Sequence, residues 1–465
     1  MSVEHVAKSI VPEEQASADK PTGVRPGELD GMTIMRYAPF YRERSSGGVE
    51  QSLRRLNHGL LQRHRLKILQ IYRVADLRNH RIEAEEAGKG QILWVPVAYR
   101  RTARRFADLP ERADFVYDQT LQVLLQSGDG VQRATAKAVW AIFRNRMRHL
   151  RHRIMVLSDP LCQLLTTHKV DLLAAHGITY DADPVIMRAK EAGIPFVLIN
   201  HFHNNLLAEP QVRKWSPFAG GVGSVSGKFM PDYISARCVN LSDAVDTEYF
   251  APDEAMVDNG DGRPKILLPA IIKMGKGQMD LLKAAHILAG KNLEFEVYFA
   301  GTVESQSLRQ ELAEYALANG LTDRVSFLGE LKQAEIRNQF ALSSMVILPT
   351  STEGLPRVLL EAQAMQRPVV AYDSGGVGET FLPNETGFLV QPGDVKDLAD
   401  KIAYLLLNKT QRRHMGKLGR EFMVSKFSVS ALIQRHEAFY LKALSGGDNP
   451  VPTTNLKNRV RAAAN

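Results

Sequence analysis

The chain has 465 residues, of which 44% are hydrophobic and 24% are charged, and its formal net charge is +8. This length exceeds the ~250–300 residues at which a single hydrophobic core stops growing, so two domains are expected. The composition is that of an ordinary soluble protein, and no apolar run approaches the ~20 residues of a membrane span. The chain has only two cysteines, Cys162 and Cys238, which argues against a disulfide framework or a cysteine-based metal site. A reducing, cytoplasmic location is therefore expected.

Residues 1–31 contain no apolar signal core, and their polar composition with Pro and Gly predicts a mobile N-terminal extension. From residue 32 to residue 245, short apolar runs alternate with helix-like segments, and strands are expected in MTIMRY, LKILQIY, ILWVPVAY, VDLLAAH and PFVLIN. The alternation restarts over residues 246–428, with strands in KILLP, FEVYFAG, RVSFLG, MVILP, PVVAY and TGFLV and helices that include residues 308–318 and 395–407. A last helix lies within residues 429–446, and residues 447–465 form a tail. Alternating strands and helices predict parallel sheets, so the fold class is α/β with two doubly wound domains.

Two glycine-rich segments of the first half predict different structures. In SSGGVEQSL, Gly47 and Gly48 follow the first strand and precede a helix that begins near Val49. Their missing side chains would let the backbone approach an anion, so either a phosphate cradle or a plain loop is expected. In GGVGSVSGK, Val222 and Phe229 stand where a phosphate-binding Walker sequence has Gly and Ser or Thr, so a strand and its turn are expected instead.

Arginines are concentrated in the first half, as in YRRTARRF at residues 99–106 and FRNRMRHLRHR at residues 143–153. Apolar residues at steps of three or four predict a helix over residues 133–157 with one apolar stripe and an arginine-covered face. Two interpretations remain open: a core-packing helix with a solvated outer face, or a surface that binds an anionic membrane or an anionic acceptor. Nucleic acid is not an expected partner, because no recognised nucleic-acid-binding motif accompanies the charge.

The segment PTSTEGLPRVLLEAQAM, residues 349–365, places two glutamates, Glu353 and Glu361, around the start of a helix. The run SSMVILP before it predicts a buried strand, and Pro356 suits the first helical turn, where its missing N–H is no loss. In an open parallel sheet, ligands bind at the carboxyl ends of the strands, where helix N-termini offer free N–H groups to phosphates. Glu353 is therefore expected at the rim of a ligand site, with Glu361 behind it.

The longer stretch PTSTEGLPRVLLEAQAMQRPVVAYDSGGVGETFLPNETGFLVQPGD resembles the donor-binding region of family 4 glycosyltransferases. The resemblance continues in GKGQMDLLKAA, DRVSFLG, VDTEYFAP, SGGVEQ and GIPFVLINHFHN, and so covers about residues 32–427. It implies the GT-B fold, in which two Rossmann-like domains face each other across a cleft. The acceptor-binding domain would be residues 32–245, the nucleotide-sugar-binding domain residues 246–428, and the helix at residues 429–446 would return to the first domain.

The activity that the resemblance implies is that of a retaining, metal-independent glycosyltransferase of the hexosyltransferase type. Such an enzyme moves a sugar from a nucleotide sugar to a saccharide or lipid-linked acceptor without a further cofactor. Cell-surface polysaccharide or glycolipid synthesis is the expected context, with the enzyme in the cytoplasm or on the inner face of the membrane. Two alternatives remain: another GT-B enzyme, such as a sugar-nucleotide epimerase or a phosphorylase, and a non-catalytic membrane or carbohydrate binder.

The resemblance also implies roles for individual residues. Glu361 would accept hydrogen bonds from the ribose hydroxyls of the donor, because a carboxylate can accept two at once. Glu353 would face the hydroxyls of the donor sugar, and the N–H groups of Gly354 and Leu355 would hold phosphate and sugar. His201, in VLINHFHN, would lie near the donor sugar and the reacting centre.

Positive charge at the diphosphate is the remaining requirement of the implied reaction, since a leaving nucleoside diphosphate builds negative charge and no metal is expected. Lys276, in GKG, matches the lysine that supplies this charge in the family, and Gly47 and Gly48 would touch the phosphates from the other domain. Where the family has a second cation, an arginine, this chain has Ile271. We expect Lys273 to replace that arginine, as a point charge rather than a bidentate fork.

Overall fold

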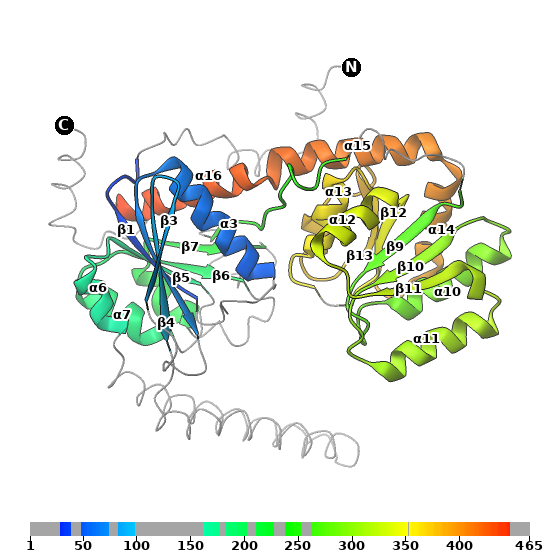
Figure 1. The fold of residues 1–465 in the computed structure, drawn as a ribbon, viewed down its shortest axis with the longest axis horizontal. Coiled ribbons are helices and arrows are strands. Elements are labelled where there is room, and N and C mark those ends of the chain that lie inside the picture. Colours follow the sequence, from blue (N-terminus) through cyan, green and yellow to red (C-terminus); the bar gives the residue numbers. More distant parts are fainter. Residues whose placement is uncertain are drawn as a thin grey trace, which may run out of the picture. The chain divides into compact units, whose positions relative to one another are not determined.

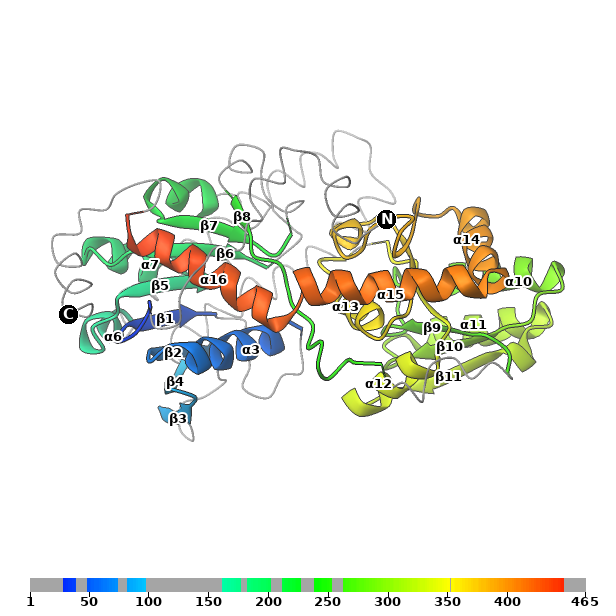
Figure 2. The same ribbon diagram turned by 90° about the horizontal axis from the view of Figure 1, so that it is seen from above.

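The computed structural model describes residues 28–38, 48–73, 82–97, 161–176, 182–201, 211–226, 238–252, 262–351 and 353–446, which Figures 1 and 2 draw in colour. The chain divides into two compact units. The first unit comprises Met1–Asn200, Asn204–Gly223 and Glu437–Asn465, and the second comprises His201–His203 and Ser224–His436. This division passes from the first unit to the second after Gly223, and the domain boundary expected at residue 245 stays a prediction.

The first sheet has eight strands in the order β3-β4-β2-β1-β5-β6-β7-β8. Its strands are β1 (Thr33–Tyr37), β2 (Lys67–Arg73), β3 (Glu83–Ala87), β4 (Gly90–Val97), β5 (Leu172–His176), β6 (Phe196–Asn200), β7 (Gly221–Ser224) and β8 (Cys238–Asn240). Strands β1, β2, β4, β5 and β6 pair in parallel, and β3 runs antiparallel to β4. Helix α3 (Gly48–Arg63) packs on β3 and β4, α7 (Asp183–Glu191) packs on β5 and β6, and α6 (Leu161–Thr167) packs on α7. Every residue of β5 and β6 is buried, as expected for parallel strands that are covered on both faces.

The edge strand β3 was not predicted from the sequence. The strand expected in GGVGSVSGK is confirmed as β7. The β3 sequence, EAEEA, lacks the β-branched and aromatic residues that favour strands, and three of its five residues are glutamates. Charged residues on an edge strand oppose pairing with another chain. The same composition that suits this position therefore hides the strand in the sequence.

The second sheet has six strands, all paired in parallel, in the order β11-β10-β9-β12-β13-β14 (Figure 1). Its strands are β9 (Lys265–Pro269), β10 (Glu296–Ala300), β11 (Val325–Gly329), β12 (Met345–Leu348), β13 (Val369–Tyr372) and β14 (Gly387–Val390). The helices of this unit are α10 (Gln278–Gly290), α11 (Gln306–Ala318), α12 (Gln333–Leu342), α13 (Arg357–Ala364), α14 (Val395–Leu407) and α15 (Lys409–Lys426). The strand order is the 3-2-1-4-5-6 order of doubly wound nucleotide-binding domains, and it reverses direction between β9 and β12. All six strands expected in this half are confirmed.

Two hydrophobic clusters cover the two faces of the second sheet. Ile266 and Leu268 of β9 lie in one cluster, together with buried residues of α10, α11 and α14. Leu267, between them on the same strand, lies in the other cluster with residues of α12, α13 and α15. Because neighbouring side chains of a strand point to opposite faces, this division shows that β9 is covered on both sides.

The segment that follows β8, residues 243–252, is bound to the second unit rather than forming a free junction between units. The Val245 N–H donates to the Phe427 carbonyl (2.8 Å), and the Arg420 guanidinium donates to the carbonyls of Thr247 (3.1 Å) and Phe250 (3.0 Å). Phe250 is fully buried among apolar residues of the same unit. Val245, Thr247 and Phe250 are therefore packed into the second unit.

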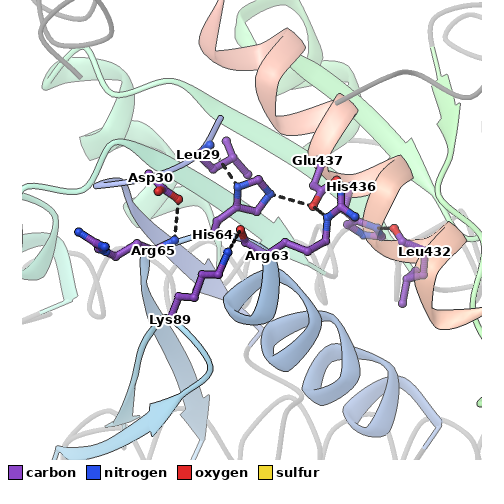
Figure 3. A network of polar contacts seen from close by, with 9 residues as sticks. All are labelled: Leu29, Asp30, Arg63, His64, Arg65, Lys89, Leu432, His436 and Glu437. Atoms are coloured by element: carbon purple, nitrogen blue, oxygen red, sulfur yellow. Dashed lines mark hydrogen bonds and ion pairs between the residues drawn. The ribbon is translucent and has the colours of Figure 1, made fainter. Parts of the chain in front are cut away.

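Helix α16 (Val429–Leu444) re-enters the first unit at Glu437, where a buried polar network holds it (Figure 3). Glu437 Oε1 lies 2.5 Å from Arg63 Nε and 2.8 Å from His64 Nε2. The Leu29 N–H donates to the Nδ1 atom of His64 (3.4 Å), so this ring carries its proton on Nε2 and donates it to the glutamate. Leu29 is fully buried, and the Asp30 carboxylate accepts a hydrogen bond from the Arg65 N–H (2.6 Å).

These contacts place Leu29 and Asp30 in the packed part of the first unit, although the sequence assigned residues 1–31 to an extension. One turn after Glu437, the Tyr440 hydroxyl accepts a hydrogen bond from Arg36 (3.1 Å), a fully buried residue of β1 that also donates to Asn57. The end of α16 is therefore held to the first unit by polar contacts one turn apart, at Glu437 and at Tyr440. Among the helices that the structure describes, none has the length and apolar character needed to cross a lipid bilayer.

Candidate active site

The candidate site lies in the second unit, at the carboxyl ends of β9 and β12. These adjacent strands flank the point where the strand order reverses, which is where open α/β sheets form a ligand-binding crevice. The loop after β9 contains Lys273 and Lys276, and the loop after β12 contains Glu353, Gly354 and Leu355. The topology therefore brings to one place five residues that the sequence assigned to donor binding.

The two loops are joined through the backbone of a glycine-rich turn. The Gly275 carbonyl accepts hydrogen bonds from the Ser351 N–H (2.9 Å) and the Thr350 hydroxyl (3.0 Å). Gly277, which precedes α10, has a φ of +78°, and a Cβ atom added there would lie 2.0 Å from the Pro349 carbonyl oxygen. Only glycine fits this position, so GKG sets how closely the two loops approach.

Lys276 and Glu353 form a direct ion pair in which the ammonium donates to Oε1 of the carboxylate. Their side chains are 20% and 19% exposed, so the pair is partly withdrawn from water and still open to a ligand. The sequence assigned these two residues separate tasks, one on the diphosphate and one on the sugar. The structure shows that they contact each other directly.

A third loop, after β13, supports the turn that carries Glu353. The Gly376 N–H donates to the Gly354 carbonyl (2.9 Å), and the Ser374 hydroxyl donates to the Thr350 carbonyl (2.7 Å). Gly375 has a φ of +53°, and a Cβ atom there would lie 1.9 Å from the Glu353 carbonyl oxygen. No role was expected of this segment, DSGG, from the sequence. Paired glycines after a buried strand nevertheless indicate a close approach of two backbone segments.

Glu361 lies on the second turn of α13, behind the Glu353 turn. Helix α13 begins at Arg357, and Pro356 is the residue just before it rather than part of its first turn. Arg357 Nη2 lies 3.5 Å from Glu361 Oε1, and Arg357 Nε lies 3.8 Å from Asp243 Oδ2. All three side chains are no more than 14% exposed. Arg357 and Asp243 were missed from the sequence, because nothing in it shows that they approach each other.

Lys273 lies on the same loop as Lys276, and its ammonium is 3.5 Å from the Glu304 carboxylate. The Lys273 side chain is 40% exposed, and Ile271, the residue in place of the family arginine, is 41% exposed. The Ile271 carbonyl accepts a hydrogen bond from the buried Gln278 side chain (2.9 Å), which fixes the backbone of the loop at this point. The replacement of the arginine by Lys273 stays a prediction.

The remaining residues assigned from the sequence belong to other parts of the chain. His201 directly follows β6 and is half-buried, and Gly48 is the first residue of α3. Gly47 lies outside the described residues, as do the arginine-rich segments at residues 99–106 and 133–157. The roles expected of them are taken up below as parts of a proposal.

Other chemistries find little support in the described part of the chain. Burial raises the pKa of the Cys238 thiol to about 12, which disfavours the thiolate form that a nucleophilic cysteine requires. Within the described ranges, no three His, Cys, Asp or Glu side chains gather in a way that could hold a metal ion.

Comparison with solved structures identifies the fold. A glycosyltransferase from Rickettsia africae superimposes with a TM-score of 0.63 at 18% sequence identity, over 90% of this chain and 99% of that protein. The Anabaena protein HepE in complex with UDP superimposes with a TM-score of 0.61 at 17% identity, over 88% of this chain and 99% of that protein. The chain therefore has the GT-B fold of glycosyltransferases, with two parallel-sheet α/β domains.

Sequence comparison identifies the family of the second unit. Residues 255–422 match the family described as "Glycosyl transferases group 1". Alpha-D-kanosaminyltransferase from Streptomyces kanamyceticus is 31% identical over 171 residues, which are 37% of this chain and 44% of that enzyme. A GDP-mannose-dependent monoacylated alpha-(1-6)-phosphatidylinositol monomannoside mannosyltransferase from Corynebacterium glutamicum is 31% identical over 182 residues, 38% of this chain and 46% of that enzyme. The matched part of the chain thus spans less than half the length of these relatives, and the family match lies within the second unit.

Proposed function

We propose that the chain is a glycosyltransferase that uses a nucleotide sugar as donor. The observation that carries the proposal is the Lys276–Glu353 pair at the switch point of a 3-2-1-4-5-6 sheet, inside the segment that matches the family. A cation for a leaving diphosphate and a carboxylate for sugar hydroxyls, placed side by side, suit this type of donor. The sugar-transferring relatives and the UDP-bound structural neighbour support the same reading.

The roles proposed for individual groups are those that the resemblance to family 4 glycosyltransferases implies. Glu361 accepts hydrogen bonds from the donor ribose, and the N–H groups of Gly354 and Leu355 hold the phosphate and the sugar. Lys276 leaves Glu353 for the β-phosphate and stabilises the negative charge that grows there as the bond to the sugar breaks. Glu353 is then released to the sugar hydroxyls.

The transfer itself is proposed to retain the configuration of the sugar. The anomeric carbon loses its bond to the β-phosphate oxygen and gains one to an acceptor hydroxyl on the same face, and the hydroxyl proton passes to the departing phosphate. His201 would orient a sugar hydroxyl, and Gly47 and Gly48 would touch the phosphates after closure of the site. Because Lys276 supplies the charge, no metal or further cofactor is needed.

The acceptor side of the proposal rests on the relatives and on the charge of the first half. One relative, CapM of Staphylococcus aureus, is named as a capsular polysaccharide biosynthesis glycosyltransferase, and the Corynebacterium glutamicum relative is named as a phosphatidylinositol monomannoside mannosyltransferase. A saccharide or lipid-linked acceptor at the inner face of a membrane is therefore proposed here. The arginine-rich segment at residues 133–157 would supply the attraction to an anionic surface.

A panel of nucleotide sugars tests the donor part of this proposal. The protein is heated with UDP-, GDP- and ADP-sugars in turn, and the shift of the unfolding temperature identifies the donor it binds. Mass spectrometry then follows hydrolysis of that donor with no acceptor present. Stabilisation by one class of nucleotide sugar together with slow release of its nucleoside diphosphate is expected. If no nucleotide sugar stabilises the protein or is consumed, the proposed activity is wrong.

A further inference from the structure

Arg357 stands between two carboxylates in the candidate site, one of which is Glu361. Its Nη2 atom faces Glu361 Oε1 at 3.5 Å, and its Nε atom faces Asp243 Oδ2 at 3.8 Å. A strong charge-assisted hydrogen bond is ~2.7–2.9 Å long, so the guanidinium orients both carboxylates through longer and weaker contacts. The exposed fraction of each side chain is 13–14%, so water screens the contacts far less than it screens a surface pair.

Asp243 is held firmly by the segment to which it belongs. Its Oδ1 atom accepts a hydrogen bond from the Ala244 N–H (2.7 Å), which leaves Oδ2 directed at Arg357. Two residues later, the Val245 N–H is bound to the Phe427 carbonyl (2.8 Å). Ser242, just before Asp243, has a φ of +41°, which is rare for a residue with a side chain and persists only where the surroundings enforce it.

The guanidinium has consequences for Glu361 that reach beyond the ion pair. Without it, two partly buried carboxylates would each lose the positive charge that they contact in the structure. With it, the Glu361 carboxylate is held on the face of α13 from which it can accept hydrogen bonds from a ligand. The planar fork of arginine has separate donor edges for two carboxylates, which a lysine lacks.

We propose that Arg357 is a positioning residue that holds Glu361 for the ribose hydroxyls of the donor and is itself fixed by Asp243. The proposal rests on the proposed function, because it takes Glu361 as the group that binds the ribose. The proposal has a specific consequence. The contacts of Arg357 with Asp243 and Glu361 set the ratio between the affinity for a ribonucleotide and the affinity for the corresponding deoxyribonucleotide. A residue that only stabilised the fold would not change that ratio.

The experiment measures the affinities of UDP, GDP and ADP and of their 2′-deoxy counterparts by calorimetry on the full chain. The parent protein is expected to bind the preferred ribonucleotide about tenfold more tightly than its 2′-deoxy form, the size of one hydrogen bond to a charged group. Arg357→Gln should reduce this preference to roughly threefold or less, while Arg357→Lys keeps part of it. In turnover, the Gln variant should raise KM for the donor far more than it lowers kcat.

Two further variants separate the possible results. Asp243→Asn should reduce the preference part of the way, and it decides the matter if Arg357→Gln does not fold. Lys401→Gln, which removes another cation from an i, i+4 pair in the same unit (3.8 Å, side chains 35% and 39% exposed), should leave the preference as it is in the parent. A parent that binds none of the three diphosphates contradicts the proposed function. If the parent protein prefers the ribonucleotide and Arg357→Gln keeps the same preference, this inference alone is overturned. If Arg357→Gln does not fold, an unchanged preference in Asp243→Asn overturns it instead.

Discussion

Replacement of Gly277 by alanine should destabilise the second unit and the candidate site together. The residue has a φ of +78°, which costs a residue with a Cβ atom ~1 kcal/mol or more. The added Cβ would also lie 2.0 Å from the Pro349 carbonyl oxygen, where ordinary contact begins at 3.4 Å. The loops after β9 and β12 must therefore separate, and overpacking of this kind costs ~1–3 kcal/mol.

The two effects together predict a loss of about 2–4 kcal/mol from the free energy of unfolding of the second unit. For a unit of this size, that corresponds to a fall of roughly 5–15 °C in its unfolding temperature. Calorimetry of the full chain measures this fall, and titration with the nucleoside diphosphate measures the accompanying loss of affinity, since Lys276 is the neighbouring residue. The nucleotide loss should exceed tenfold, because the displaced loop carries the cation that meets the phosphate.

Gly290→Ala is the matched control, because Gly290 ends the same helix that Gly277 precedes. No atom lies within 4 Å of a Cβ added at Gly290, and its φ is not positive. Alanine there should be neutral or stabilise the helix by up to ~1 kcal/mol. Equal unfolding temperatures and equal nucleotide affinities for the two variants would refute the claim that Gly277 sets the approach of the two loops.

Three other predictions concern charge. Lys273→Ala should lower turnover much as removal of Lys276 does, and Ile271→Arg in the Lys273→Ala background should recover part of the lost turnover. Unchanged turnover and donor affinity in Lys273→Ala would show that Lys273 does not take part in donor binding or transfer. Activity should survive a chelator, since the proposed reaction takes its positive charge from lysine, and loss that magnesium or manganese restores would contradict this. Full-length protein should bind vesicles with acidic lipids at low salt and dissociate from them as the salt concentration rises. Replacement of Arg144, Arg148 and Arg151, within residues 133–157, by glutamine should abolish this binding. Equal binding by the variant and the parent would make the segment a structural element.

The second sheet was readable from the sequence because its strands are short, apolar and β-branched and are separated by helices of ordinary composition. The runs KILLP and MVILP became β9 and β12, and the segment between Pro349 and Met365 became the expected turn and helix. The loop residues that the family resemblance pointed to follow the carboxyl ends of those strands, and their roles stay predictions. Local pattern and fold agree there, which is the condition under which sequence reasoning works.

What could not be read from the sequence depends on contacts between distant segments. Lys276 and Glu353 are 77 residues apart, and only the pairing of β9 with β12 brings them into contact. Arg357 meets Asp243 because residues 243–252 pack against the rest of the second unit. β3 was missed because its glutamates suit an exposed edge and resemble a loop.

The Lys276–Glu353 pair leads to a last prediction, about the affinity for a nucleoside diphosphate. The direction of the change in affinity distinguishes a coupled pair from two residues that act independently. If the lysine must leave the carboxylate to meet a phosphate, Glu353 competes with the ligand for the lysine. Glu353→Gln should then bind the free nucleoside diphosphate more tightly than the parent does, by about twofold to tenfold, although its turnover falls roughly a hundredfold for lack of the sugar contact. Lys276→Met should lose affinity by more than the removal of one cation, since it leaves the bare carboxylate facing the diphosphate.

The double variant should regain part of that affinity, with a coupling of ~0.5–3 kcal/mol between the two positions. Calorimetric titration of the parent, the two single variants and the double variant with one nucleoside diphosphate measures the whole cycle. Effects that add within ~0.3–0.5 kcal/mol, or weaker binding by Glu353→Gln than by the parent, would mean that the pair does not control access to the phosphate. The opposite result would make donor binding an exchange of partners at Lys276, in which the diphosphate takes the place of a carboxylate that the reaction then uses.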